Sequence, residues 1–284
     1  MWIGAEPLDL QLTLIDSAQC FRWVRSGERY GCALAGAPVW LWREEDGLHA
    51  EGDVDPALLR CYLDLDRDYA AVAAEYAHIP QARRAIELFP GLRVLNQPAW
   101  EALVCFILSA NNNVGRIRGL VDALSRRCGA DCGGLYALPT PEQLAAVPEE
   151  ALRSLKVGYR APFLIGAARR VCEGFPLDSL RMLPYAEAHA ALVTLPGVGD
   201  KVADCVLLFG CGHASAFPVD VWVDRLLRDW FGVRCASRAA MGREARARLG
   251  AHAGLMQQFL FHAARTGASA LAGDAGTDGK IQAL

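Results

Sequence analysis

The sequence predicts an α+β fold in which an N-terminal antiparallel β subdomain packs on a mainly α-helical body. Short aromatic or β-branched segments, separated by glycine-containing turns, fill the first 50 residues. From about Pro56 onward the apolar residues follow helical spacing. Apolar residues make up 53% and charged residues 21% of the 284 residues, so the chain can bury a core.

The individual elements follow from local signals. Strands are expected over 20–24, 31–36, 38–44 and 47–52. Helices are expected after proline, Thr-Pro or aspartate start signals, over 98–110, 116–128, 141–146, 161–172, 186–195, 200–209, 221–231, 237–249 and 255–264. We therefore expect a β-rich subdomain with the first helices over 1–95, a helical region over 96–265 and a flexible tail over 266–284.

The charge distribution allows a nucleic-acid partner despite a net charge of −3. Residues 1–90 hold 8 basic and 15 acidic side chains, whereas the rest of the chain holds 21 basic and 17 acidic ones. A local basic face can bind phosphates even when the whole chain is acidic. No apolar run is long enough to span a membrane and no secretion signal begins the chain, so we expect a soluble, intracellular protein.

Two glycines flank one residue in the segment Leu195-Pro-Gly-Val-Gly-Asp-Lys201, between two expected helices. Gly197 and Gly199 permit the positive φ of a tight turn around Val198. The turn uncovers backbone N–H groups at the start of the second helix, where the helix dipole favours an anion. An ordinary helical hairpin would also use these glycines, but the full pattern favours a DNA phosphate as the ligand of hairpin 195–201.

Lys201 lies in the first turn of the second helix, where its charge opposes the helix dipole. A plain phosphate-binding lysine is one explanation. The other is that the dipole favours the neutral amine, which alone can attack a carbon. Asp220 follows in Phe217-Pro-Val-Asp, directly before an expected helix, and capping alone would explain an aspartate there.

Together, the hairpin and the Pro-Val-Asp segment resemble the helix-hairpin-helix (HhH-GPD) base-excision DNA glycosylases. The sequence is most similar to the 8-oxoguanine DNA glycosylases, from Ser17 to about Ala264. The motifs that carry the resemblance occur in the family's order: Gln19-Cys-Phe-Arg-Trp23, residues 111–113 with Arg116, Gly158-Tyr-Arg160, the hairpin and Pro-Val-Asp. The resemblance implies that Lys201 is the nucleophile and Asp220 the catalytic carboxylate.

The resemblance also implies how the DNA is opened, because the glycosidic carbon cannot be reached while the base is stacked. Asn111 would fill the vacated space and Tyr159 would wedge into the stack. Arg116 and Arg160 would bind the orphan cytosine, although phosphate binding is an alternative for both. Trp222 replaces a histidine of eukaryotic relatives, and we expect its indole N–H to contact a phosphate.

The same resemblance predicts the base pocket. Cys205 and Phe261 would sandwich the flipped purine, and Gln257 would bind its Watson–Crick edge. Each of the first two could instead be a core residue. Ala18 stands where the family has a glycine whose carbonyl accepts the N7 hydrogen of 8-oxoguanine. The carbonyl survives this change, but the added methyl group can shift the backbone.

The predicted function is therefore a bifunctional DNA glycosylase and AP lyase that excises 8-oxoguanine, preferably opposite cytosine. The expected partner is double-stranded DNA, bound by a monomer acting in the nucleoid or cytoplasm of a bacterium or the nucleus of a eukaryote. No catalytic metal or redox cofactor is expected, although a structural monovalent cation at the hairpin is compatible with this function.

Three alternatives fit the sequence less well. Another glycosylase for oxidised bases is disfavoured, because such enzymes usually carry a C-terminal iron–sulfur cluster and no cysteine follows Cys235. A non-catalytic helix-hairpin-helix module would need neither Lys201 nor Asp220. A zinc-binding protein is least favoured, since the ten cysteines lack zinc-site spacing.

Overall fold

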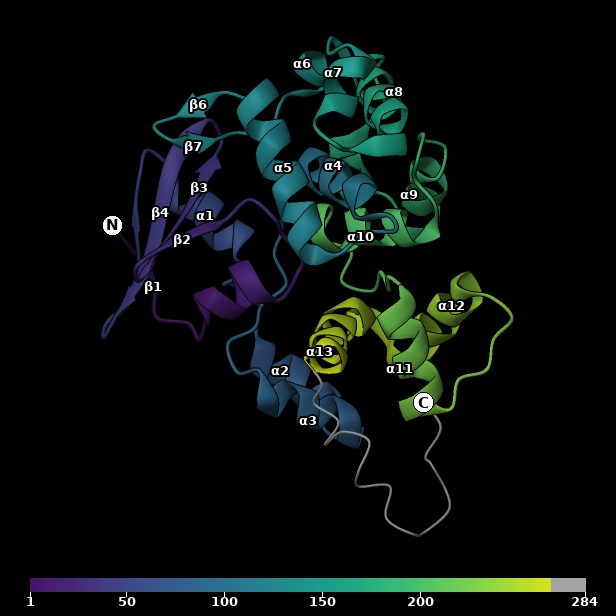
Figure 1. The fold of residues 1–284 in the computed structure, drawn as a ribbon. Helices are drawn as coiled ribbons and strands as arrows, with labels where there is room; N and C mark the ends of the chain where they lie inside the picture. Colours follow the sequence, from purple (N-terminus) through teal and green to yellow (C-terminus); the bar gives the residue numbers. More distant parts are fainter. Residues whose placement is uncertain (267–284) are drawn as a thin grey trace.

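The computed structural model describes residues 1–266 and confirms the α+β prediction. A five-stranded antiparallel sheet with the order β1-β5-β4-β3-β2 lies on one side of the helical body (Figure 1). Its strands are β1 (Trp2–Gly4), β2 (Val24–Ser26), β3 (Arg29–Leu34), β4 (Ala37–Glu44) and β5 (Gly47–Glu51). The predicted tail, 266–284, lies outside the described residues except for its first one.

One expected strand, 20–24, is wrong over its first four residues. Only Val24 of this segment belongs to a strand. The neighbouring aromatic residues serve two different cores, since Phe21 packs with the helical body and Trp23 packs with the sheet. Arg22 between them pairs with Glu101. The segment therefore connects the two cores. Its apolar residues resemble those of a strand, and this is why a strand was predicted.

The helices agree with most of the predicted ranges. They are α1 (Pro56–Tyr62), α2 (Tyr69–Glu75), α3 (Pro80–Leu88), α4 (Ala99–Ser109), α5 (Val114–Cys128), α6 (Pro141–Ala145), α7 (Glu149–Ser154), α8 (Ala161–Cys172), α9 (Tyr185–Leu192), α10 (Asp200–Gly210), α11 (Val221–Phe231), α12 (Arg238–Leu249) and α13 (Ala253–Arg265). The elements that were not predicted are short. They include a π-helix, η1 (Gln11–Asp16), the hairpin β6 (Asp131–Cys132) and β7 (Leu135–Tyr136), and α7.

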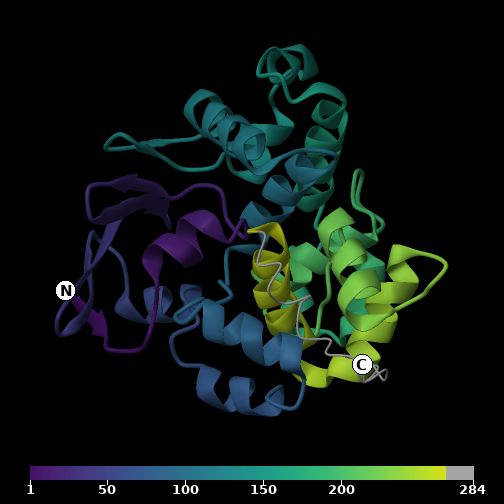
Figure 2. The same cartoon turned by 60° about the horizontal axis from the view of Figure 1, so that its bottom comes forward.

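The helices form two groups, and the space between them positions the functional site. One group runs from α4 to α10, and the other gathers α2, α3, α11, α12 and α13 (Figures 1 and 2). Although α2 and α3 precede residue 95, α3 packs against α13 rather than against the sheet. Of α1, α2 and α3, it is α1 whose buried side chains join the core of the sheet, through Leu59 and Tyr62, and η1 joins the same core through Leu14. Among residues 1–266, no helix combines the length and apolar character needed to cross a membrane.

Candidate active site

The hairpin between α9 and α10 uses its two glycines differently. Gly197 has φ of 78°, and a Cβ built there would lie 2.6 Å from Cβ of Phe163. Gly199 has φ of −101°, so it does not supply the positive φ that we expected of both glycines. It is instead the N-cap residue of α10, with no side-chain cap and no atom within 4 Å of an added Cβ. Val198 is buried and anchors the turn on the core.

Lys201 lies in the first turn of α10, as predicted, and its amine is held by α4. Its Nζ donates a hydrogen bond to Oγ of Ser109 at 3.0 Å and lies 4.9 Å from the centre of the Phe106 ring. Oγ of Ser109 in turn donates to the carbonyl of Phe106 at 2.7 Å. Ser109 was not among the residues predicted for the site, although a small polar residue that ends a mostly apolar helix two positions before Asn111 was a usable signal.

Asp220 is the N-cap residue of α11, in agreement with the sequence. Its Oδ1 accepts hydrogen bonds from the backbone N–H groups of Trp222 and Val223, both at 2.9 Å. No described residue donates to its Oδ2. The carboxylate lines the same cavity as Lys201. The cap therefore holds one oxygen of the carboxylate and leaves the other available to the cavity.

A cleft of about 670 Å³ lies between the two helical groups and receives residues from both. Lys201 and Ser109 come from one group, and Asp220 and Phe261 from the other. A recess of about 50 Å³ adjoins the cleft and shares Ala18, Lys201, Asp220 and Phe261 with it. The two catalytic and four base-pocket residues that were predicted all line this recess: Lys201, Asp220, Ala18, Cys205, Gln257 and Phe261.

Two polar side chains of the recess, Cys205 and Gln257, are neutral. Burial raises the pKa of the Cys205 thiol to about 12, so this thiol stays protonated at neutral pH. The side chain of Gln257 is buried, and its Nε2 donates to the Pro218 carbonyl at 3.2 Å. Its Oε1 is buried without a hydrogen-bond partner. A buried, unsatisfied amide oxygen is costly unless a ligand supplies a donor.

Ala18 lies at the edge of both cavities and has φ of 60°. This left-handed conformation favours glycine and costs an alanine roughly 1–2 kcal/mol. The chain therefore keeps a glycine-like backbone at this position.

The residues predicted to handle the opened duplex gather where the α4–α5 turn meets the 3₁₀-helix η2 (Gly158–Arg160). Asn111, with φ of 48°, donates to the hydroxyl of Tyr159 at 3.2 Å. Tyr159 is 48% exposed although it is aromatic. Arg116 is exposed and reaches the Lys156 carbonyl at 3.5 Å. The exposed aromatic ring of Tyr159 suits stacking on a base, and the exposed guanidinium of Arg116 suits hydrogen bonds to one.

Arg160 differs from its neighbours, because it is only 4% exposed. Its guanidinium donates to the carbonyls of Ala110, Asn111 and Val157 and lies 4.5 Å from the centre of the Tyr159 ring. In this structure it braces the turn that carries Asn111. Direct contact with an orphan base would require some of these bonds to be exchanged.

Trp222 lines the cleft at the start of α11 and is 40% exposed. The guanidinium of Arg225 lies 5.6 Å from the centre of its indole ring. The adjacent Val221 is also exposed. Exposed apolar side chains beside a basic group are typical of a surface that a partner covers.

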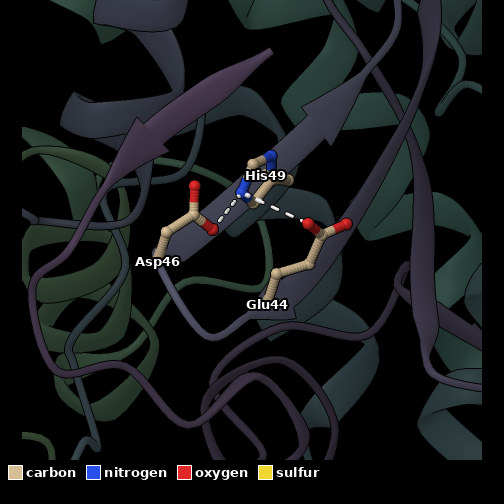
Figure 3. Close-up of side chains that lie close together, drawn as sticks. All are labelled: Glu44, Asp46 and His49. Atoms are coloured by element: carbon tan, nitrogen blue, oxygen red, sulfur yellow. Dashed lines mark hydrogen bonds and ion pairs between the residues drawn. The ribbon is translucent and has the colours of Figure 1, made fainter.

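One group with the spacing of metal ligands exists among residues 1–266, and it lies elsewhere. Glu44, Asp46 and His49 meet at the β4–β5 turn of the N-terminal sheet, with ligand atoms within 4.8 Å of one another (Figure 3). Nε2 of His49 lies 2.7 Å from Asp46, and this contact lowers the pKa of that carboxyl group. Trp42 donates to Glu44. These side chains pair with one another on the surface, and we assign them no catalytic role.

Comparisons with known proteins agree with this geometry. Residues 2–103 match the N-terminal domain of 8-oxoguanine DNA glycosylases, and residues 104–249 match the HhH-GPD superfamily of base excision DNA repair proteins. The chain is 31% identical over 292 residues to the N-glycosylase/DNA lyase OGG1 of Arabidopsis thaliana, across 92% of this chain and 79% of that one.

Solved structures show the same relationship. The structure of MBOgg1 with a low-affinity DNA ligand has a TM-score of 0.86 at 31% identity, covering 93% of this chain and 94% of that one. The 8-oxoguanine glycosylase/lyase of Clostridium acetobutylicum, bound to double-stranded DNA with cytosine opposite 8-oxoguanine, has a TM-score of 0.86 at 29% identity and covers 92% and 93%. The chain therefore belongs to the 8-oxoguanine DNA glycosylase family of the HhH-GPD superfamily.

Proposed function

We propose that this protein is a bifunctional DNA glycosylase and AP lyase that removes 8-oxoguanine from double-stranded DNA and then cuts the strand. The observation that carries this function is the recess in which an amine, Lys201, and a carboxylate, Asp220, meet the side chains predicted to bind a base. Relatives named for the same two activities, including one solved with an 8-oxoguanine:cytosine duplex, support it.

The chemistry requires the damaged nucleotide to leave the stack and enter the cleft. The neutral amine of Lys201 attacks C1′ of the sugar and forms an N–C1′ bond, while the C1′–N9 bond breaks and its electron pair leaves with the base. The carboxylate of Asp220 stabilises the positive charge that develops on the sugar. The attached amine then gives one proton to the departing base and one to the ring oxygen as the C1′–O4′ bond breaks, and a Schiff base results. Removal of a proton from C2′ then expels the 3′ phosphate by β-elimination.

Recognition of the base is assigned to neutral groups. The protonated thiol of Cys205 and the ring of Phe261 would flank the purine, and the unpartnered Oε1 of Gln257 would accept a hydrogen bond from its edge. The carbonyl of Ala18 would accept the N7 hydrogen that 8-oxoguanine carries and guanine lacks. A preference for cytosine opposite the lesion would come from Arg116, with Arg160 joining after rearrangement.

DNA docking is assigned to the hairpin and to Trp222. The bare N-terminus of α10 at Gly199 offers backbone N–H groups to a phosphate. No described residue donates to the carbonyls of Pro196 and Gly197, and such oxygens suit a monovalent cation. We propose that a monomer binds DNA in this way, in whichever compartment holds the chromosome. Weaker DNA binding when KCl is replaced by tetramethylammonium chloride would support the cation.

The decisive experiment compares the protein with Lys201→Gln on duplexes that hold one 8-oxoguanine opposite each of the four bases. We expect the parent to cleave best opposite cytosine and to form a covalent adduct with DNA in borohydride. Lys201→Gln should lose both reactions, while the control Arg84→Gln, at an exposed basic residue of α3, should keep both. A Lys201→Gln protein that still forms the adduct would refute the assignment, and a parent that only binds DNA would indicate a non-catalytic module.

A further inference from the structure

The turn that carries Ala18 is held by side chains from elsewhere in the chain. It follows the π-helix η1, whose last carbonyls need hydrogen-bond donors from outside the helix. Arg118 of α5 donates to the Ile15 carbonyl, and Arg265 of α13 donates to the Asp16 carbonyl. The N-terminal segment is thereby fastened to the two helical groups that form the cleft.

Two buried glutamines fasten the residues on either side of Ala18. Nε2 of Gln258, on α13, donates to the Ser17 carbonyl at 2.8 Å. Nε2 of Gln97, directly before α4, donates to the Gln19 carbonyl at 2.7 Å. Both glutamine side chains are at most 3% exposed. No described residue donates to the carbonyl of Ala18, a residue that lies between these two bonds and lines the recess.

The conformation of Ala18 needs such support. An alanine rarely adopts a φ of 60°, because its Cβ crowds the following carbonyl oxygen. Residues in sparsely populated backbone regions persist only where their surroundings over-determine them. The two glutamine bonds supply this constraint, since they hold the carbonyls directly before and after the strained residue.

We propose that Gln97 and Gln258 are positioning residues that hold the free carbonyl of Ala18 at the recess and thereby set the recognition of the oxidised base. The inference rests on the proposed function. An acceptor held there binds the N7–H of 8-oxoguanine and faces the lone pair of guanine N7, an acceptor itself. We call these two hydrogen bonds, from Gln258 to Ser17 and from Gln97 to Gln19, the clamp. Without the clamp, the turn relaxes and the carbonyl no longer meets the base.

The test separates base recognition from the chemistry of Lys201. Single-turnover rates are measured for Gln258→Met and Gln97→Met on a duplex with 8-oxoguanine opposite cytosine, and on the same duplex with an abasic site in place of the lesion. Methionine keeps the length of the side chain and removes the donor. An abasic site has no base to recognise, so its cleavage requires Lys201 and does not require the Ala18 carbonyl.

We expect each variant to lose about tenfold or more on 8-oxoguanine, as for a lost hydrogen bond of about 1.4 kcal/mol, and to cleave the abasic duplex within about twofold of the parent. Ala18→Gly placed in the Gln258→Met protein should restore part of the lost excision, because glycine adopts a positive φ without support. Thermal unfolding is followed for every variant, and Gln97→Met serves if Gln258→Met does not fold.

Equal losses on both substrates in folded variants, or unchanged excision of 8-oxoguanine, would overturn the clamp while the proposed function stands. A parent protein that cleaves abasic sites but leaves 8-oxoguanine intact would overturn the proposed substrate, and the clamp with it. The two failures are therefore distinguishable in one set of reactions.

Discussion

The amine of Lys201 donates its hydrogen bond to Ser109 at 3.0 Å, and the hydroxyl of Ser109 cannot return one, because its own proton is given to the Phe106 carbonyl at 2.7 Å. A neutral amine bonded in this way keeps its lone pair free for a carbon in the cleft. The end of α4 thus orients the nucleophile of α10. Sequence spacing cannot show this contact, because the two residues are 92 positions apart.

Replacing Ser109 with alanine should therefore slow the attack of Lys201. We expect a loss of about tenfold in the single-turnover rate of excision and in the rate of borohydride trapping, since misplacing a reacting group is costly. The matched control is Ser154→Ala, because Ser154 makes the same bond to a carbonyl three residues earlier, on the exposed helix α7. Equal rates for both variants and the parent would show that Ser109 does not orient the amine.

Asp220 combines a capping role with a catalytic role, and two substitutions separate them. Asparagine is an equally good N-cap residue, so Asp220→Asn should unfold at the temperature of the parent protein. It lacks the charge, so excision should fall by about 100-fold or more while lesion binding persists. Asp220→Ala should also lose about 1 kcal/mol of unfolding free energy. Undiminished excision by the asparagine variant would contradict the electrostatic role.

The two hairpin glycines should respond in opposite ways to alanine. In Gly197→Ala, the alanine must adopt a positive φ and its methyl group collides with the Phe163 side chain. The free energy of unfolding should therefore fall by at least about 2 kcal/mol. In Gly199→Ala, the methyl group projects into open space, so the free energy of unfolding should fall by less than about 1 kcal/mol. Its methyl group would stand between the bare amides of α10 and a phosphate, so its affinity for duplex DNA should fall. Binding and thermal unfolding are measured for both, and similar profiles would refute this division of roles.

The sequence predicted those features whose causes are local. The cap at Asp220 follows from its own neighbours, since Asp220 precedes a strong helical pattern, and α8 and α11 have the predicted bounds. Gly199 was expected to have a positive φ and caps α10 instead. The strand expected over 20–24 failed because a local pattern cannot show that Phe21 and Trp23 pack into different cores. The last carbonyls of the π-helix η1 accept hydrogen bonds from Arg118 and Arg265, which lie more than 100 residues away in the sequence. No local sequence pattern predicts this helix.

The candidate site divides in the same way. Lys201 and Cys205 share a helix face at a spacing of four, so physics alone could place them together. The arrival of Ala18 and Phe261 at the same recess was expected only from the family resemblance. Ser109, Gln97 and Gln258 were missed, because each acts through a tertiary hydrogen bond to another residue of the site.

A buried histidine on α13 should make the stability of the helical body depend on pH. Burial, assisted by Arg265, lowers the pKa of His262 from its ordinary value of 6.5 to about 4, against a weaker opposing effect of Asp16. The imidazole packs edge-on against Phe89, with ring centres 4.5 Å apart. Between pH 6.5 and 4 the unfolded chain binds a proton at this residue and the folded chain does not. Stability is therefore complete above about pH 6.5 and falls as the pH decreases toward 4.

His262→Phe keeps a buried ring and removes this titration. Between pH 7.5 and pH 5, the parent should lose about 2 kcal/mol more unfolding free energy than His262→Phe, measured by denaturant unfolding at each pH. His78→Phe, at an exposed histidine, should behave like the parent protein. If the phenylalanine variant at 262 keeps the acid sensitivity of the parent, the loss must arise at other groups. The comparison also concerns the site, because α13 carries Gln257, Gln258 and Phe261.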